Sequence, residues 1–277
     1  MQARDLQLAF TRNKSPEELL ADLYRQNPCG VLPNAFWKTR KSIREGEARL
    51  RFHEEALAEM AVFAHGGVPA YWRAPGGEAL LFTPEMPWAF CLLHERDRGL
   101  IPDDGSVAAQ AYFRLSLQPG AAGWNRLPPV YRFVNVDPEK DVPAVASIIA
   151  ACYDSIRPDE ASVRSWMKHP VYNPALWVWI ENTRTGEREA LGIAEFDPSF
   201  AEGSLEWIQT HPASRGRGLG QALVNELLTR LAAKAKIITV SGKCVTDDRV
   251  ESFYRRCGFQ DHDVWWHLQK KEGTIPV

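Results

Sequence analysis

The sequence predicts an α+β protein built from two domains. In the second half of the chain the predicted elements follow the order β-α-α-β-β-β-α-β-α-β. Before them, residues 117–130 contain three prolines and two glycines, which interrupt both helix and strand patterns. The composition, 45% hydrophobic and 25% charged over 277 residues, is that of an ordinary globular protein. We therefore expect a smaller α+β domain over 1–120 and a second domain over 128–277.

The first domain is expected to hold two helices and four short strands. Ser15 followed by Pro16 and two glutamates is a good helix start, which predicts a helix to about Gln26. Residues 54–64 predict a second helix, and the basic and aromatic stretch 27–46 is interpreted as a solvated loop that places Trp37 in the core. A hairpin is expected between the first two strands, and the predicted strands cover 68–73, 78–83, 87–93 and 109–117.

The second domain has the sharper pattern. Apolar residues of 219–235 recur at i, i+4 and i+7, so one face of this helix is expected to be buried. The other helices are predicted over 141–156, 159–169 and 247–258, and the strands over 130–136, 175–182, 188–196, 204–210, 236–242 and 263–269.

Charge and cysteine content narrow the function classes. The net charge of −2 gives no support for binding nucleic acid or an anionic membrane. The five cysteines form no C-x-x-C pair and no zinc spacing with histidine, so reduced thiols in a cytoplasmic protein without a metal are expected. The first 20 residues lack the apolar core of a signal peptide, and no apolar run approaches about 18 residues.

The segment RGRGLG, Arg215–Gly220, precedes the amphipathic helix and has the character of an anion site. The first amides of a helix lack internal partners and lie at the positive end of its dipole, and glycines let a ligand approach closely. No Lys-Ser/Thr pair follows, which excludes a Walker A loop, and Gln221 occupies the last glycine position of a dinucleotide fingerprint. A tight connection with glycines placed for packing is the remaining alternative.

Two motifs together indicate a family. THPASRGRGLGQAL (210–223) resembles the R/Q-x-x-G-x-G/A loop of the GNAT N-acyltransferase superfamily, and SFYRRCGF (252–259) resembles its FYxxxGF signature. The resemblance covers residues 130 to 270. It implies a mixed, mostly antiparallel sheet with splayed central parallel strands flanked by helices, and an acyltransferase that uses acetyl-CoA.

The resemblance also implies where acetyl-CoA binds. Its pyrophosphate would lie on the glycine loop, and its pantetheine arm would lie between the splayed strands 206–210 and 237–241, paired with the backbone of the first. The cofactor-binding residues expected on this basis are Ile208, Thr210, Arg215, Gly216, Arg217, Gly218, Leu219 and Gly220.

Acyl transfer to an amine needs a base for the amine and an acid for the leaving thiolate. The family's tyrosine lies close to the thioester sulfur, which makes Tyr254 the candidate acid. Glu206 is the candidate base, because it is a lone acid in an apolar strand and alternation places it on one face with Ile208 and Thr210. Glu195 on the neighbouring strand is the rival base.

Four further positions qualify this picture. His211 is expected to be a loop residue beside the cofactor, and Cys244 and Cys257 are interpreted as packing residues. Asp247 stands where the family often has an asparagine, which weakens the contact with CoA expected there.

The predicted function is transfer of an acetyl group from acetyl-CoA to a primary amine of a small molecule or peptide, by direct attack in a ternary complex. The alternative is an acyl-CoA-binding sensor or regulatory module without catalysis. Residues 1–120 could be a degenerate acyltransferase-like domain or serve in substrate recognition or dimerisation, and a homodimer stays open. The acceptor cannot be derived from the fold alone.

Overall fold

The computed structural model describes residues 14–83, 85–101, 103–120, 127–153, 155–244 and 249–271. The chain separates into two compact units that are not consecutive in sequence. Among the described residues, the first unit comprises 14–114, 242–244 and 262–271, and the second comprises the remainder. The first boundary, after Arg114, lies near the predicted division, but the first unit also takes two late segments.

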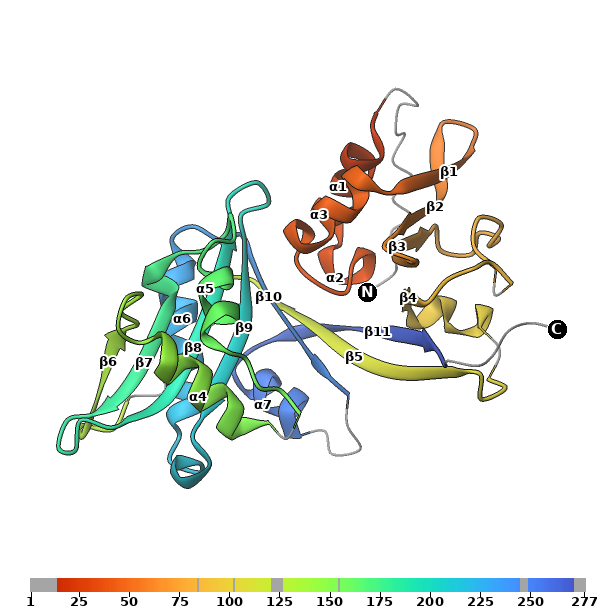
Figure 1. Ribbon diagram of the computed structural model, residues 1–277. Helices are drawn as coiled ribbons and strands as arrows, with labels where there is room; N and C mark the ends of the chain where they lie inside the picture. The colour runs from red at the N-terminus through yellow and green to blue at the C-terminus, as the bar shows by residue number, and fades with distance from the viewer. Residues whose placement is uncertain are drawn as a thin grey trace. The chain divides into compact units, whose positions relative to one another are not determined.

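The first unit combines three helices with a twisted sheet (Figure 1). Its sheet follows the order β1-β2-β3-β4-β11, antiparallel except that β3 and β4 are parallel. Three strands, β5, β10 and β11, contain residues of both units. The elements are α1 (Pro16–Gln26), α2 (Pro28–Val31), α3 (Phe36–Glu45), β1 (Glu47–His53), β2 (Ala56–Ala64), β3 (Gly67–Arg73), β4 (Phe90–His94), η1 (Glu95–Leu100), β5 (Val107–Leu117), β10 (Ile237–Lys243) and β11 (Gln260–Lys270).

The helix start at Ser15 is confirmed, but the helix predicted over 54–64 is wrong. The Ser15 hydroxyl accepts a hydrogen bond from the Glu18 amide, and the Glu18 carboxylate accepts one from the Ser15 amide. Residues 56–64 instead form β2, which pairs with β1 on one side and β3 on the other. Alanine, glutamate and methionine favour a helix, but pairing on both edges and burial on both faces outweigh this local preference.

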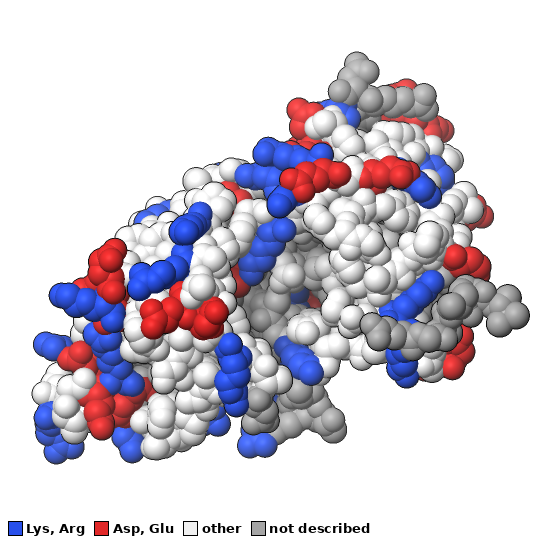
Figure 2. All heavy atoms as spheres, viewed as in Figure 1, with Lys and Arg blue, Asp and Glu red and all other residues white. Residues whose placement is uncertain are grey.

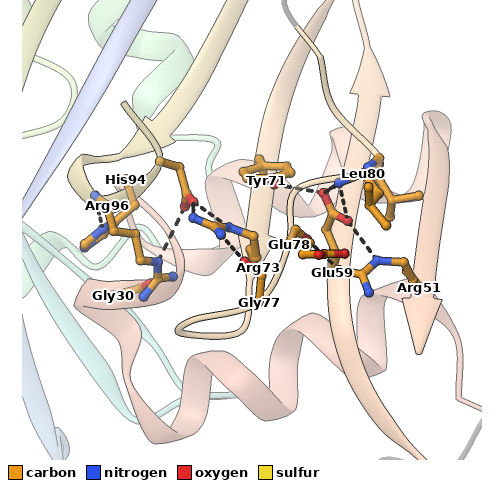
Figure 3. Close-up of polar contacts among 12 residues, drawn as sticks. Gly30, Arg51, Glu59, Tyr71, Arg73, Gly77, Glu78, Leu80, His94 and Arg96 are labelled. Carbon is orange, nitrogen blue, oxygen red and sulfur yellow. Dashed lines mark hydrogen bonds and ion pairs between the residues drawn. The ribbon is translucent and has the colours of Figure 1, made fainter. Parts of the chain in front are cut away.

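Two further expectations for this unit are wrong. Residues 27–46 form the helices α2 and α3 rather than a solvated loop, and Phe36, not Trp37, is the fully buried aromatic. Residues 78–83 form no strand, and the hairpin joins β2 to β3. The reason lies in Glu59, a completely buried carboxylate on β2 that accepts hydrogen bonds from the Leu80 and Leu81 amides at 3.0 and 2.9 Å (Figure 3). These amides are therefore satisfied without a strand neighbour.

The second unit confirms the predicted order of elements. Strands β6 to β9 form an antiparallel meander, and β10 then lies parallel to β9. The elements are β6 (Tyr131–Asn135), α4 (Val142–Cys152), α5 (Glu160–Trp166), η2 (Pro174–Leu176), β7 (Trp177–Asn182), β8 (Arg188–Asp197), β9 (Glu202–Thr210), η3 (Pro212–Ser214), α6 (Leu219–Ala232) and α7 (Arg249–Arg256).

Helices cover both faces of this meander, with α4 and α5 on one side and α6 on the other (Figure 1). Two strand glycines permit the close approach of α6. A methyl group at Gly192 would come within 2.8 Å of Leu223, and one at Gly203 within 2.7 Å of Leu231. On the opposite face, Trp177 and other large apolar side chains pack against α4. None of the helices in the described ranges is long and apolar enough to span a bilayer.

Candidate functional site

The glycine loop has a backbone shape that only glycine adopts readily. Gly216 and Gly218 have φ values of 79° and 77°, in the left-handed region, and Gly218 is the N-cap of α6. The N-cap residue of α6 is a glycine, so it offers no side chain to the first amides of this 14-residue helix, which lie at the positive end of the helix dipole.

A pocket of about 590 Å³ opens beside this loop. Seven of the eight residues expected to bind the cofactor line it, and so does the candidate acid Tyr254, so the structure brings the two motifs together. The lining residues are Ile208, Gln209, Thr210, Arg215, Gly216, Gly218, Leu219, Gly220, Gln221, Arg249, Val250, Phe253, Tyr254 and Arg256.

Arg217 is the expected cofactor residue that does not line this pocket. Its guanidinium pairs with the buried carboxylate of Glu189 at 3.1 Å and donates to the Tyr131 hydroxyl at the same distance. The Glu189 carboxylate also accepts from Tyr131 and Asn182, at 3.0 and 2.9 Å. The sequence carried no signal for this ion pair, because Glu189 lies on β8, 28 residues before Arg217. In the structure, Arg217 ties the glycine loop to β8.

Burial by itself would raise the pKa of Glu189. Hydrogen bonds from Asn182, Ser214 and Tyr131, together with the charge of Arg217, outweigh it and hold the pKa of this carboxyl below its ordinary value. Glu189 is therefore ionised at neutral pH, as its role in fixing Arg217 requires.

The parallel strands β9 and β10 separate beside the pocket. Their pairing runs from Glu202↔Ile237 to Leu205↔Val240, and beyond this point the described parts of β9 and β10 do not pair, although β9 continues to Thr210. This is the splay that the resemblance implied. Within the part of the chain that the structure describes, one backbone edge of residues 206–210 therefore has no strand neighbour, next to the pocket-lining Ile208 and Thr210.

A β-bulge places Glu206. On β8, Ala194 pairs with Leu205 and Ile193 pairs with Trp207, so Glu206 is the extra residue. The sequence expectation of regular alternation from Glu206 to Thr210 is therefore interrupted. Ile208 pairs with Gly192 on the α6 face, whereas the Glu206 carboxylate accepts a hydrogen bond from the Ser204 hydroxyl at 2.8 Å.

Tyr254 is 8% exposed and belongs to α7. Burial raises the pKa of its phenol, and the nearby Tyr153, Cys257 and Glu206 raise it further. The phenol therefore stays protonated at neutral pH, which is the form that a general acid needs. Glu206, the candidate base, is not among the residues that line the pocket.

The other candidate groups have local partners. Glu195, 7% exposed, lies 3.4 Å from the His169 Nδ1, and the His211 Nδ1 accepts from the Ala213 amide at 3.4 Å. Burial raises the pKa of Cys257 to about 11, which disfavours a thiolate. Asp247 lies outside the described residues.

Sequence reasoning missed the contribution of α7 to the pocket wall. Arg249, Phe253 and Arg256 follow one another at i, i+4 and i+7, and all three line the pocket. This spacing was present in the sequence, but only the pocket shows that this helix face borders the glycine loop.

The cationic character of the pocket is local. On the face shown in Figure 2, basic and acidic side chains are interspersed, in keeping with the net charge of −2. By contrast, the pocket wall carries three arginines and, among the described residues, no carboxylate. Within the described ranges no group of three or more His, Cys, Asp or Glu side chains is arranged to hold a metal ion.

Comparisons with known proteins agree with this geometry. An acetyltransferase (GNAT) domain model matches residues 173–261. A GNAT-family acetyltransferase from Colwellia psychrerythraea superposes with a TM-score of 0.59 at 11% identity, covering 91% of this chain and 97% of its own. No curated protein sequence matches the chain.

Two other solved structures share the fold. A tandem GNAT protein from the clavulanic acid biosynthesis pathway gives a TM-score of 0.55 at 13% identity and covers 95% of this chain and 97% of its own. A GCN5-related N-acetyltransferase from Sphaerobacter thermophilus gives a TM-score of 0.55 at 14% identity. The match covers 68% of this chain and 62% of the length of that protein. With the matched domain model and the two motifs around one pocket, residues 173–261 form a domain of the GNAT acetyltransferase family.

Proposed function

We propose that this protein transfers an acetyl group from acetyl-CoA to a primary amine of a small molecule or peptide, by direct attack in a ternary complex. One observation carries the proposal: a single pocket extends from the glycine loop at the N-terminus of α6 to the buried phenol of Tyr254. An anion site and a proton donor are thereby joined along the splayed edge of β9.

The donor would bind in two parts. The first amides of α6 and the Arg215 guanidinium would hold the diphosphate, because both offer donors to phosphate oxygens. The amide groups of the pantetheine arm would pair with the open edge of 206–210, as an added strand does. This arrangement points the thioester toward Tyr254.

The chemistry then requires three groups. An alkylamine has a pKa near about 10.4 and must lose a proton before it attacks, and Glu206 would take this proton, directly or through water. The nitrogen bonds to the thioester carbonyl carbon while a backbone amide of β9 stabilises the oxyanion. When the carbon–sulfur bond breaks, the thiolate takes the phenol proton of Tyr254. The products are the acetylated amine and CoA.

Donor binding is the first test. Calorimetry should show acetyl-CoA binding to the wild type and not to Gly220→Glu, which puts a negative charge into the phosphate site. Gly220 has an ordinary φ, and a methyl group there would meet Thr210 and Phe253 only at 3.4 Å or more, so this variant should fold. Thr229→Glu, on the exposed side of the same helix, is the charge-matched control. Absence of binding to the wild type would overturn the proposal.

Turnover is the second test. A panel of amines is screened with the wild type, and Tyr254→Phe should lower kcat about 10²–10⁴-fold while the acetyl-CoA Kd stays unchanged. Circular dichroism checks that the variant is folded. If acetyl-CoA binds but no amine is acetylated, the protein is a sensor module and the catalytic part of the proposal fails.

A further inference from the structure

The bulge in β9 turns the candidate base toward the α4 face of the sheet. On β8, Ile193 belongs to the core that packs against α4, and by alternation Glu195 lies on the same face. Their partners on β9 are Trp207 and Ser204, which therefore lie on this face as well. Because the Ser204 hydroxyl donates to the Glu206 carboxylate at 2.8 Å, this carboxylate is also there. An amine that gives its proton to Glu206 must approach from the α4 face.

Three aromatic rings form a surface on this face. The rings of Trp166 and Trp207 are stacked, with centroids 5.3 Å apart and planes at 21°, and the Tyr153 ring meets Trp207 edge-on at 6.0 Å. These three residues, the aromatic surface, come from α5, β9 and the C-cap of α4. Both tryptophans are half-buried, and Tyr153 is 39% exposed. Rings left open to solvent offer a large contact area to a flat apolar ligand.

The segment after α4 adds exposed apolar area and is held in place. Among the described residues four large apolar side chains are exposed, and Tyr153 and Ile156 are two of them. The guanidinium of Arg157 donates to the carbonyl oxygens of Ala150, Tyr153 and Ile156. A segment that is already ordered loses little entropy when a ligand binds to it, so this arrangement suits recognition.

The aromatic surface adjoins the pocket beside the glycine loop. Gln209 lines that pocket, and its side-chain amide donates to the Tyr153 hydroxyl at 3.1 Å. The Cys152 thiol, also at the end of α4, donates to the carbonyl oxygen of Thr210, another residue of the pocket, at 3.5 Å. A ligand on the aromatic surface would therefore lie beside the acetyl donor, which the proposed function places in the pocket.

Negative charge borders the aromatic surface. Glu206 directly precedes Trp207 in the strand, and Glu195 lies on the same face, 3.4 Å from the His169 Nδ1. Carboxylates attract an ammonium group and repel a ligand that carries a carboxylate beside its amine. The complement of this face is therefore a cationic amine on a flat apolar body.

We propose that the acceptor is a primary amine joined by a short chain to an aromatic ring, which binds with its ring on the aromatic surface and its ammonium group beside Glu206. The inference rests on the proposed function and names the class of its acceptor. Trp166 and Trp207 then determine specificity. The chemistry is that of the proposed function: the amine loses a proton to Glu206, its nitrogen takes the acetyl group, and CoA leaves with the proton of Tyr254.

The test measures kcat and KM on the full chain with acetyl-CoA and three acceptors: phenethylamine, n-butylamine and phenylalanine. For the wild type, kcat/KM for phenethylamine should exceed that for n-butylamine at least about tenfold, because only the first amine places a ring on the aromatic surface. Phenylalanine adds a carboxylate beside the same amine and should be poorer than phenethylamine by about the same factor.

The variant Trp166→Leu/Trp207→Leu keeps apolar side chains but removes the flat surface. Its preference for phenethylamine over n-butylamine should fall at least about fivefold through a higher KM for phenethylamine. The KM for n-butylamine and the acetyl-CoA Kd should stay within about twofold of the wild type, which also shows that the variant is folded. Trp266→Leu is the control, because Trp266 is a half-buried tryptophan of the first unit whose indole donates to Glu95. It should keep the wild-type preference.

Three results would overturn the inference while the proposed function stands. They are a wild type without preference for phenethylamine over n-butylamine, a double variant that keeps the preference, and faster turnover of phenylalanine than of phenethylamine. A preference lost equally in Trp266→Leu would also refute it, because a general disturbance would then explain the loss. If acetyl-CoA binds but no amine of the wider panel is acetylated, the proposed function fails and the inference fails with it. If other amines are acetylated and phenethylamine is not, only the inference fails.

Discussion

The two units share an order of elements and differ in one connection. In the first unit, helices precede the antiparallel strands β1, β2 and β3, and β4 is parallel to β3. In the second, α4 and α5 precede β7, β8 and β9, and β10 is parallel to β9. The glycine loop and α6 join the parallel strands of the second unit. In the first, the described residues between 74 and 89 contain no helix.

This difference decides which backbone amides can meet a ligand. At the start of α6 the N-cap glycine offers no side-chain cap, and the first residues of the helix line a pocket. In the first unit the Leu80 and Leu81 amides donate to Glu59, which also accepts from the Tyr71 hydroxyl at 2.8 Å (Figure 3). A carboxylate of the protein satisfies these donors internally. The two units therefore differ in the connection between their parallel strands, and only the connection in the second unit carries the glycine loop.

The largest effect on stability is expected from Glu59→Ala. Without the Glu59 carboxylate, the Tyr71 hydroxyl, the guanidinium of Arg51 and two backbone amides lose their hydrogen-bond acceptor. The free energy of unfolding should therefore fall by about 3–5 kcal/mol. Urea denaturation measures it, with Glu47→Ala on the surface of β1 as the control. Where the variant is folded, its acetyl-CoA Kd should stay within about twofold of the wild type. A larger change in the Kd would contradict the view that Glu59 serves stability alone and that the ligand site lies in the second unit.

Glu189→Gln tests how the glycine loop is held. Without the charge that fixes Arg217, acetyl-CoA should bind about tenfold more weakly, with kcat nearly unchanged. Arg132→Ala, which breaks an exposed ion pair with Glu181, is the control and should have no effect. A drop in kcat with unchanged KM would contradict the assignment of Glu189 as a positioning residue.

The same carboxyl predicts a pH dependence. Because the folded-state pKa of Glu189 is below the ordinary value of 4.5, its stabilisation is complete above that pH and is lost as the pH falls through the lower folded-state pKa. Urea titrations of the wild type and Glu189→Gln should therefore converge as the pH falls below 4.5. A difference that persists unchanged in acid would show that the charge of Glu189 is not responsible.

Smaller effects are expected within the loop itself. Gly218→Ala should cost about 1–2 kcal/mol of stability, because the left-handed φ of 77° is unfavourable for a residue with a Cβ. Gly220→Ala should cost less, since its added methyl meets only ordinary contacts. Thermal unfolding of the two variants compares them. Equal losses would mean that space and not backbone conformation selects glycine here.

The smallest effect is expected for the alkaline pH dependence of kcat/KM, which Tyr254 should leave unchanged. Because the pKa of Tyr254 is raised above its ordinary value of 10.0, the phenol keeps its proton over the neutral and mildly alkaline range. In the wild type, kcat/KM for acetyl-CoA should therefore not fall at alkaline pH below about pH 10 because of Tyr254. A fall in this range that is present in the wild type and absent from Tyr254→Phe would contradict the prediction. That result would mean that the pKa of Tyr254 is lower than its burial implies.

The sequence alone determined the features that depend on local chemistry. The capping box at Ser15 and the glycines at 216 and 218 could be identified because caps and left-handed turns need particular residue types at fixed spacing. The order of elements in the second unit followed from hydrophobic periodicity. The two motifs indicated the family, and the structure then brought both to one pocket.

Only the tertiary structure decided what depends on partners distant in sequence. Residues 56–64 became a strand because both neighbours pair with it, Arg217 turned to Glu189, and a bulge displaced Glu206 from the expected alternation. Only the structure shows that Arg249 and Arg256 of α7 line the same pocket as the glycine loop. The physical reason is common to all of them: burial, pairing and charge act between elements, and their energies exceed the local preferences that a sequence displays.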